Sequence, residues 1–293
     1  QRVSFLLAGK FPTSFGRRKQ LSLTRYESSK PPETSQLSLL CYGLYKRGKS
    51  RFGLSAPPPI TIANLDRDIR ALIGEVCPDK EVYYDNIWPV SGKATGQSEV
   101  NDMIRRVEFA AREALKHGTG TFILDGVHRL YNLLQIKLLG ADYSQGKPDG
   151  DSSQLGFAKI YSYFDELFLP FQSSNVNLIL TAPARKQYQR VTRASGKTGA
   201  DATGNYEPRI PDVLGYILHA QIYFFTRPGR PIKFHGRLDW SAYNNQMLSG
   251  MEFDDPDWDT VTAFMTTEIT EPMQPMEESI NLGEALAGKG DDD

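Results

Sequence analysis

Residues 36–50 read QLSLLCYGLYKRGKS, a short apolar run that leads into a basic turn containing two glycines. From Gly43 to Ser50 the spacing is glycine, four residues, then Gly-Lys-Ser. In a phosphate-binding loop the glycines let backbone N–H groups curl around a phosphate, the lysine reaches the outer phosphates and the serine hydroxyl binds Mg²⁺. The spacing therefore predicts a nucleotide site at Gly43, Gly48, Lys49 and Ser50.

The segments on either side of this turn have the composition that such a loop requires. Residues 36–43 are mostly apolar and of strand length, and residues 49–56 can form a short helix before Pro57 ends it. An ordinary basic turn remains the alternative, because Lys46 and Arg47 occupy positions where many phosphate-binding loops carry small residues.

The overall composition is that of a globular chain. Its 293 residues are 40% hydrophobic and 24% charged, which is enough to bury a full core. Cys41 and Cys77 fit neither a disulfide framework nor a metal-ligand spacing, and the four histidines lack the i, i+4 pairing of a zinc helix. We expect reduced cysteines, no metal other than Mg²⁺ and a cytoplasmic location, the host cytoplasm if the chain is viral. No apolar run reaches the ~18 residues of a membrane span, so no membrane partner is expected.

Charge is unevenly distributed although the net charge is only −1. Residues 1–50 hold ten Lys or Arg against two acids, whereas residues 251–293 hold one Lys against thirteen acids. This asymmetry predicts a basic N-terminal arm over 1–36, a core over 37–248 and an acidic C-terminal extension over 249–293. We expect the extension to be a solvated segment. The alternative is that it recruits a protein partner or competes with nucleic acid for the basic surface.

Beyond the basic turn, strand-like and helix-like patterns alternate. Residues 98–117 place apolar side chains on one helical face, with Ser98 as the expected cap and Gly118 as the end. The other expected elements are strands at 60–66, 81–90, 119–125 and 175–182 and a helix at about 155–171, which a linker separates from the third strand. Such alternation predicts an α/β fold with a mainly parallel sheet, helices on both faces and ligands at the carboxyl ends of the strands.

Three carboxylates fall at those expected strand ends. Asp125 closes an apolar strand, and we predict that it holds Mg²⁺ through water. Asp66 and Asp68 lie two residues apart, which would place them on the same side of a strand. We predict that one of them orients and deprotonates an attacking water. The alternative is that they only cap the helix that follows.

A second basic segment, residues 185–209, is expected to be a flexible loop. It contains six Lys or Arg against two acids, with Tyr188 and Tyr206 interleaved. Cationic loops with aromatic residues suit single-stranded nucleic acid, since charge follows the backbone and rings stack on bases. A solvated surface loop is the alternative. The predicted contacts are Arg185, Lys186, Tyr188, Arg190, Arg193 and Lys197.

Taken in order over roughly residues 36–240, these motifs resemble the RecA-like P-loop ATPases. The resemblance is to the short phage-encoded members associated with recombination and single-strand annealing. It is carried by GLYKRGKS, then ITIANLDRD with its acid-any-acid ending, then FILDGVHRL, and then NVNLILTAPARK followed by a basic segment. The resemblance implies a RecA-like core that binds ATP and Mg²⁺.

The same resemblance implies particular roles. Lys49 and Ser50 would bind phosphate and Mg²⁺, Asp68 would stand at the position of the catalytic acid, and Asp125 would be the acid linked to Mg²⁺. The chain departs from the family pattern at Asp68, where a longer Glu is usual, and at Thr181, where many relatives carry an amide or another sensor group. Nucleotide binding is therefore better supported than fast hydrolysis.

The expected function is that of a Mg-ATP-binding ATPase acting on single-stranded DNA in recombination, repair or replication, with self-association left open. One alternative is a nucleotide-bound structural or assembly component, viral in origin, with little or no hydrolysis. Another is a small-molecule kinase in which residues 185–209 close over a second substrate.

Overall fold

The computed structural model describes residues 36–66, 68–88, 96–140, 152–192, 198–227, 233–242 and 248–266. All of them belong to one compact unit, residues 34–293. The basic arm expected over 1–36 therefore lies outside the described residues except for Gln36. Residues 267–293 of the acidic extension also lie outside them, as do Arg193 and Lys197.

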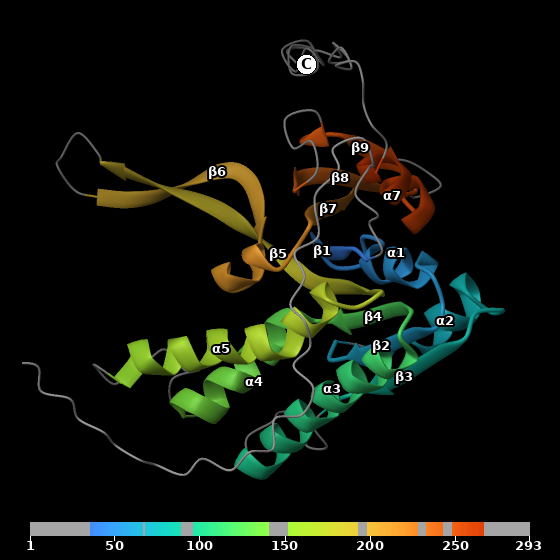
Figure 1. The fold of residues 1–293 in the computed structure, drawn as a ribbon. Coiled ribbons are helices and arrows are strands. Elements are labelled where there is room, and N and C mark those ends of the chain that lie inside the picture. The colour runs from blue at the N-terminus through green and yellow to red at the C-terminus, as the bar shows by residue number, and fades with distance from the viewer. Residues whose placement is uncertain are drawn as a thin grey trace, which may run out of the picture. The chain divides into compact units, whose positions relative to one another are not determined.

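A nine-stranded sheet forms the centre of the described part of the chain (Figure 1). Its order is β3-β2-β4-β5-β1-β7-β8-β9, with β6 paired to β5. The strands from β3 to β7 in this order run parallel, and β8 and β9 add to that edge in antiparallel fashion. The strand bounds are β1 (Ser38–Gly43), β2 (Ile60–Asn64), β3 (Val82–Asn86), β4 (Gly120–Asp125), β5 (Val176–Thr192), β6 (Thr198–Pro208), β7 (Ala220–Thr226), β8 (Phe234–Ser241) and β9 (Glu252–Asp254).

Helices cover both faces of this sheet (Figure 1), which confirms the predicted α/β class. Because side chains alternate along a strand, Leu40 and Tyr42 of β1 enter one core while Leu39 and Cys41 enter the other. The first core lies under α3 (Gln97–His117), α4 (Val127–Leu139) and α5 (Ser152–Gln172), and the second under α1 (Lys49–Ser55), α2 (Arg70–Val76) and α7 (Trp258–Thr266). Within the described ranges, we find no helix with the length and apolar character needed to cross a lipid bilayer.

Two local expectations were wrong. Helix α3 begins at Gln97 after Gly96, so Ser98 lies inside its first turn and does not cap it, whereas Gly118 ends the helix at φ 73° as predicted. The residues after Asp125 form helix α4 and not a linker. Buried apolar side chains at helical spacing carried that signal, at Val127, Leu130, Leu133 and Leu134.

The third correction concerns residues 185–209, of which 185–192 and 198–208 form the paired strands of a β-hairpin in place of the expected flexible loop. Strand β5 runs on for 17 residues and pairs with β6 in antiparallel fashion, and the 3₁₀ turn η2 (Asp212–Tyr216) follows. The hairpin projects from the sheet in Figure 1. Its projecting part is largely exposed on both faces, so it carries little of the apolar alternation by which strands are recognised from sequence.

Candidate functional site

The turn from Gly43 to Ser50 connects the end of β1 to the beginning of α1, in the order that the sequence predicts. A Cβ atom at Gly43 would lie 2.2 Å from the carbonyl oxygen of Phe224 on β7. Gly48 has a φ of 93°, in the left-handed region, and a Cβ atom there would lie 3.0 Å from the ring of Phe234. Both glycines are therefore needed for the backbone to pass this close to β7 and Phe234.

Lys49 is the first residue of α1, and its side chain folds back over the turn. Its Nζ donates hydrogen bonds to the carbonyl oxygens of Gly43, at 3.1 Å, and Leu44, at 2.9 Å. Burial lowers the pKa of Lys49, and the negative charges of Asp125 and Asp66 oppose that shift. The turn thus holds an ammonium group on its inner side, close to two carboxylates.

Asp125, the last residue of β4, is only 6% exposed and accepts hydrogen bonds from two hydroxyl groups. Ser50 Oγ donates to its Oδ2 at 2.8 Å, and Thr181 Oγ1 donates to its Oδ1. The Thr181 hydroxyl in turn accepts a hydrogen bond of 2.9 Å from the Gly126 N–H. Burial raises the pKa of Asp125, while the two hydroxyl donors and the charge of Lys49 act against the rise. Elements α1, β4 and β5 therefore meet at one carboxylate.

Asp66 lies beside the same turn, although not on a strand. Strand β2 ends at Asn64, so both Asp66 and Asp68 follow the strand, and the expectation that they share one of its sides was wrong. Asp66 Oδ1 accepts hydrogen bonds from the Tyr45 hydroxyl, at 2.7 Å, and from the Arg129 guanidinium, at 3.1 Å. It therefore connects the Gly43–Ser50 turn to helix α4.

Asp68 is held at the beginning of α2. Its carboxylate accepts hydrogen bonds from the backbone N–H of Arg70, at 3.0 Å, from the Arg70 guanidinium, and from Asn86 Nδ2, at 3.3 Å. The hydrogen bonds from Arg70 lower the pKa of Asp68 to about 2. The contact with the Arg70 N–H is that of an Asx turn just before α2, whose N-cap is Ile69, so Asp68 does not cap the helix in the way that the alternative predicts.

A cavity of about 530 Å³ joins these groups. Besides the residues expected from the sequence, it is lined by His128 and Arg129 of α4 and by Phe234 of β8. His128 Nδ1 is buried without a hydrogen-bond partner among the described residues, and burial together with Arg129 lowers the pKa of His128 to about 4. Sequence reasoning missed the two α4 residues because it took the start of this helix as a linker. The predicted residues that line the cavity are Gly43, Gly48, Lys49, Ser50, Asp66, Asp68, Asp125 and Thr181.

A scan against protein-family models and a search of the curated proteins both returned no match.

The donor set of the cavity fits Mg²⁺ bound together with a phosphate ligand. Mg²⁺ prefers oxygen ligands and is usually held by one or two protein side chains plus waters and substrate phosphates. The Ser50 hydroxyl and the Asp125 carboxylate supply such oxygens, and Lys49 adds a cation for the phosphates. Among the described residues there is no cluster of three or more His, Cys, Asp or Glu that could hold a metal without a ligand.

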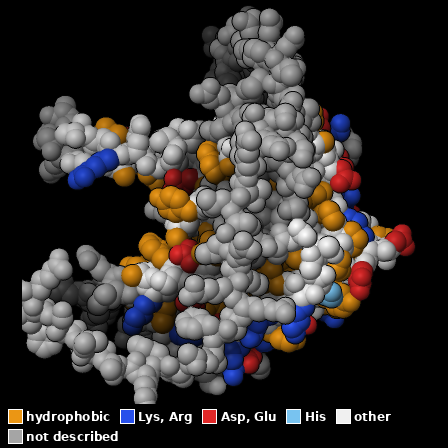
Figure 2. All heavy atoms as spheres, viewed as in Figure 1, with side chains coloured by type: hydrophobic (Ala, Val, Ile, Leu, Met, Phe, Trp, Pro, Cys, Tyr) orange, Lys and Arg blue, Asp and Glu red, His pale blue; other side chains and the backbone are white. Residues whose placement is uncertain are grey.

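The hairpin sorts the predicted nucleic-acid residues onto two faces. Lys186, Tyr188 and Arg190 alternate along β5 and so lie on one side of it, which we call the hairpin face, although the pairing with β6 shifts in register between Lys186 and Tyr188. Tyr188 is 59% exposed, and Figure 2 shows Lys or Arg side chains on the projecting hairpin. Arg185 points to the opposite face, where it forms an ion pair of 2.7 Å with Glu207.

Proposed function

We propose that the protein binds Mg-ATP in the cavity between the Gly43–Ser50 turn and Asp125. The observation that carries this proposal is the hydrogen-bonded cluster of Ser50, Asp125 and Thr181 beside Lys49. It lies at the carboxyl ends of parallel strands, the place where open α/β sheets bind their ligands. A buried carboxylate with a raised pKa is also a recognised mark of a functional site.

Each residue of the cluster has a role that its chemistry fits. The backbone N–H groups of the turn and the Lys49 ammonium would hold the phosphates. Ser50 and Asp125 would hold the Mg²⁺, which would neutralise negative charge on the phosphates when bound. Thr181 would orient Asp125 through its hydroxyl and so act as a positioning residue.

Hydrolysis requires a residue that orients the attacking water, and Asp68 and Asp66 are the candidates. Asp68 is engaged by Arg70 and Asn86, and Asp66 by Tyr45 and Arg129. A carboxylate with a pKa of about 2 is a weak base, which favours slow turnover. This engagement of both acids is the observation that favours the second candidate function, a nucleotide-bound structural or assembly component with little or no hydrolysis.

The order of the motifs along the chain supports a more specific proposal, namely a RecA-like core that acts on single-stranded DNA. Strand β5 lies between β1 and β4 in the sheet, so Thr181 is positioned next to both the turn and Asp125. The same strand continues without a break to Lys186, Tyr188 and Arg190. Occupancy of the nucleotide site could thus be communicated along one strand to a basic, aromatic surface suited to single-stranded DNA.

The test is ATP turnover, measured with and without single-stranded DNA and with and without Mg²⁺. We expect slow Mg²⁺-dependent turnover that single-stranded DNA accelerates. Tight Mg-ATP binding without turnover in either condition would favour the structural component. Failure of ATP to bind at all would contradict both functions.

A further inference from the structure

Next to the hairpin, three strands place aromatic side chains in a row on one face of the sheet. Tyr206 of β6 stacks on Tyr223 of β7, with ring centroids 5.8 Å apart and planes 13° apart. Tyr223 stacks on Phe225 at 5.7 Å and 14°, and Phe225 stacks on His235 of β8 at 5.4 Å and 24°. We call these four residues the aromatic row. Their planes are nearly parallel although they come from three different strands.

The aromatic row lies on the less covered face of β7. On the other face of this strand, Ile222 and Phe224 are fully buried in the core that also contains α1 and α7. The helices on the side of the row, α3 to α5, make their main contacts with β2, β4 and β5 within the described part of the chain. Tyr206, Tyr223 and Phe225 accordingly remain only half-buried, whereas His235 at the end of the row is buried.

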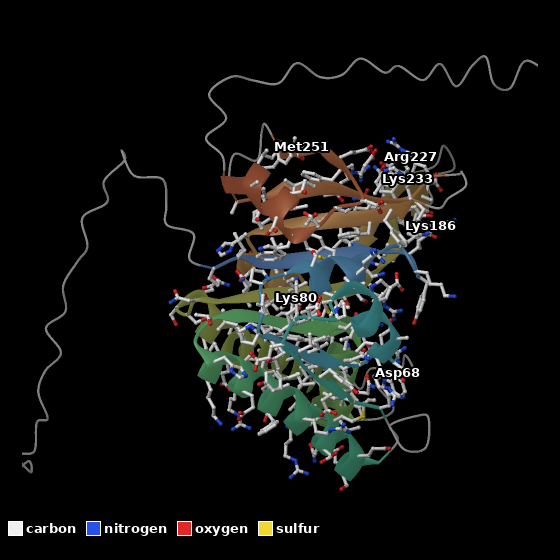
Figure 3. All side chains as sticks on the ribbon, turned by 90° about the vertical axis from the view of Figure 1, so that its right-hand side faces the viewer. Asp68, Lys80, Lys186, Arg227, Lys233 and Met251 are labelled. Carbon is white, nitrogen blue, oxygen red and sulfur yellow. The ribbon has the colours of Figure 1, made fainter. Side chains whose placement is uncertain are left out.

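Cations accompany the rings. The Arg237 guanidinium lies 5.4 Å from the centroid of the Tyr223 ring, and that of Arg227 lies 5.8 Å from the centroid of Phe225. The positive charge of Arg47, in the Gly43–Ser50 turn, acts to lower the pKa of the Tyr223 hydroxyl, which burial raises. In Figure 3, Lys186, Lys233 and Arg227 lie along the same side of the molecule as Asp68, the side on which the parallel strands end.

Acidic residues balance these cations only in part. Arg237 donates to Asp239, Arg227 donates to Glu252, and His235 contacts Asp254. The ion pairs of Arg237 and Arg227 hold these two arginines over the rings. Lys186 and Lys233 add further positive charge on this side of the molecule (Figure 3), which suits a polyanion.

We propose that the aromatic row is a stacking platform for single-stranded nucleic acid that continues the hairpin face. The choice of single-stranded nucleic acid as the ligand rests on the proposed function. The aromatic row adds to it a second binding surface, which the basic hairpin alone does not imply. Stacking of bases on aromatic rings tolerates any sequence, and arginines beside the rings contact the phosphates.

The geometry joins the two surfaces into one path. Lys186 on the hairpin face is directly opposite Tyr206, the first member of the row. The hairpin face from Lys186 to Arg190 spans only about 13 Å, which a short oligonucleotide can cover, whereas Tyr206, Tyr223 and Phe225 extend the path from β6 across β7. Gly43, which lines the nucleotide cavity, pairs with Phe224 of β7, between Tyr223 and Phe225, so the path runs beside that cavity.

Binding of a short and a long oligothymidylate, of about 6 and about 20 nucleotides, separates the two surfaces. The row variant combines Tyr206→Leu and Phe225→Leu, and the hairpin variant combines Lys186→Ala and Arg190→Ala. We expect the row variant to bind the long strand at least about tenfold more weakly and the short strand as the wild type does. The hairpin variant should lose affinity for both. Tyr84→Leu on the opposite edge strand β3, where Tyr84 is 45% exposed, is the matched aromatic control and should bind like the wild type.

Ultraviolet cross-linking of the unmodified protein to the long strand keeps the test decisive if the row variant does not fold. Mass spectrometry should find linked nucleotides on peptides that contain Tyr206, Tyr223 or Phe225. Cross-links confined to the hairpin, with unchanged long-strand affinity in a folded row variant, would overturn the inference and leave the proposed function standing. A wild-type protein that binds neither oligonucleotide would overturn the inference together with the DNA part of the proposed function.

Discussion

Ser50 and Asp125 are 75 residues apart in the chain, yet Ser50 Oγ donates a hydrogen bond of 2.8 Å to Asp125 Oδ2. Ser50 lies on α1, which follows β1, and Asp125 ends β4; these two strands are not neighbours, because β5 lies between them. The contact therefore spans β5 at Thr181, which donates to the other oxygen of the same carboxylate. A buried carboxylate held by two hydroxyl groups beside a lysine is an arrangement that a Mg²⁺-phosphate ligand can use.

Asp125→Asn should weaken Mg²⁺-dependent ATP binding by about ten- to a hundredfold. Asn keeps the size of the side chain and one acceptor oxygen, so the fold should be retained while the negative charge is lost. Binding of a fluorescent ATP analogue across a Mg²⁺ series measures the effect, with Asp79→Asn on the exposed turn after α2 as the control. An unchanged Mg²⁺ dependence would remove Asp125 from the site.

Asp68→Asn should leave ATP affinity unchanged and lower kcat at least about tenfold, if Asp68 positions the attacking water. Single-turnover kinetics and equilibrium binding on the same variant separate the two quantities. Unchanged turnover would move the catalytic assignment to Asp66, which Asp66→Asn tests in the same assay. If neither variant alters a measurable turnover, neither acid is catalytic.

Lys186→Ala with Arg190→Ala should weaken binding to every single-stranded sequence alike. Each lost phosphate contact should also reduce the slope of log affinity against log salt by about 0.7. Arg185→Ala, compared with Lys186→Ala and with Arg190→Ala singly, is the matched control, because each removes one positive charge and Arg185 lies on the opposite face, paired with Glu207. Filter-binding titrations across a salt series measure both quantities. Equal losses in the variant and the control would mean that the hairpin face is not a specific contact surface.

Thr181→Val should uncouple the nucleotide cavity from the hairpin face. It preserves the shape of the side chain but removes the donor to Asp125 and the acceptor for the Gly126 N–H. Loss of the acceptor should lower stability by about 1–3 kcal/mol. We expect acceleration of turnover by DNA to be lost, with DNA binding in the absence of nucleotide unchanged. Thr181→Ser restores a hydroxyl and should restore the acceleration, and a Val variant that responds normally to DNA would argue against coupling along β5.

The sequence predicted the elements that strong local patterns specify. The glycine spacing from Gly43 to Ser50 and the apolar strands before Gly43 and Asp125 depend on backbone geometry and burial, which act over a few residues. Local signals could not show that β5 would lie between β1 and β4. They also could not show that Asp68 would turn to Arg70, because both a helix cap and a catalytic acid use the same residue type in the same place.

The remaining site features depend on contacts between distant segments. His128 and Arg129 enter the cavity only because α4 begins directly after Gly126. The aromatic row depends on the register that places Tyr206 opposite Lys186 and His235 opposite Phe225. Ladder pairing satisfies the backbone polar groups of the hairpin, so these strands form without the apolar alternation that identifies a strand.

The phosphate-loop assignment is tested by calorimetric titration of Mg-ATP into the wild type, Lys49→Ala and Lys46→Ala. Lys49 is half-buried with its ammonium over the turn, whereas Lys46, in the same turn, is exposed. We expect tight binding in the wild type, a loss of at least about tenfold in Lys49→Ala with its melting temperature retained, and near wild-type binding in Lys46→Ala. Equal affinity of the wild type and a folded Lys49→Ala variant would contradict the assignment and leave the Gly43–Ser50 turn an ordinary basic connection between β1 and α1.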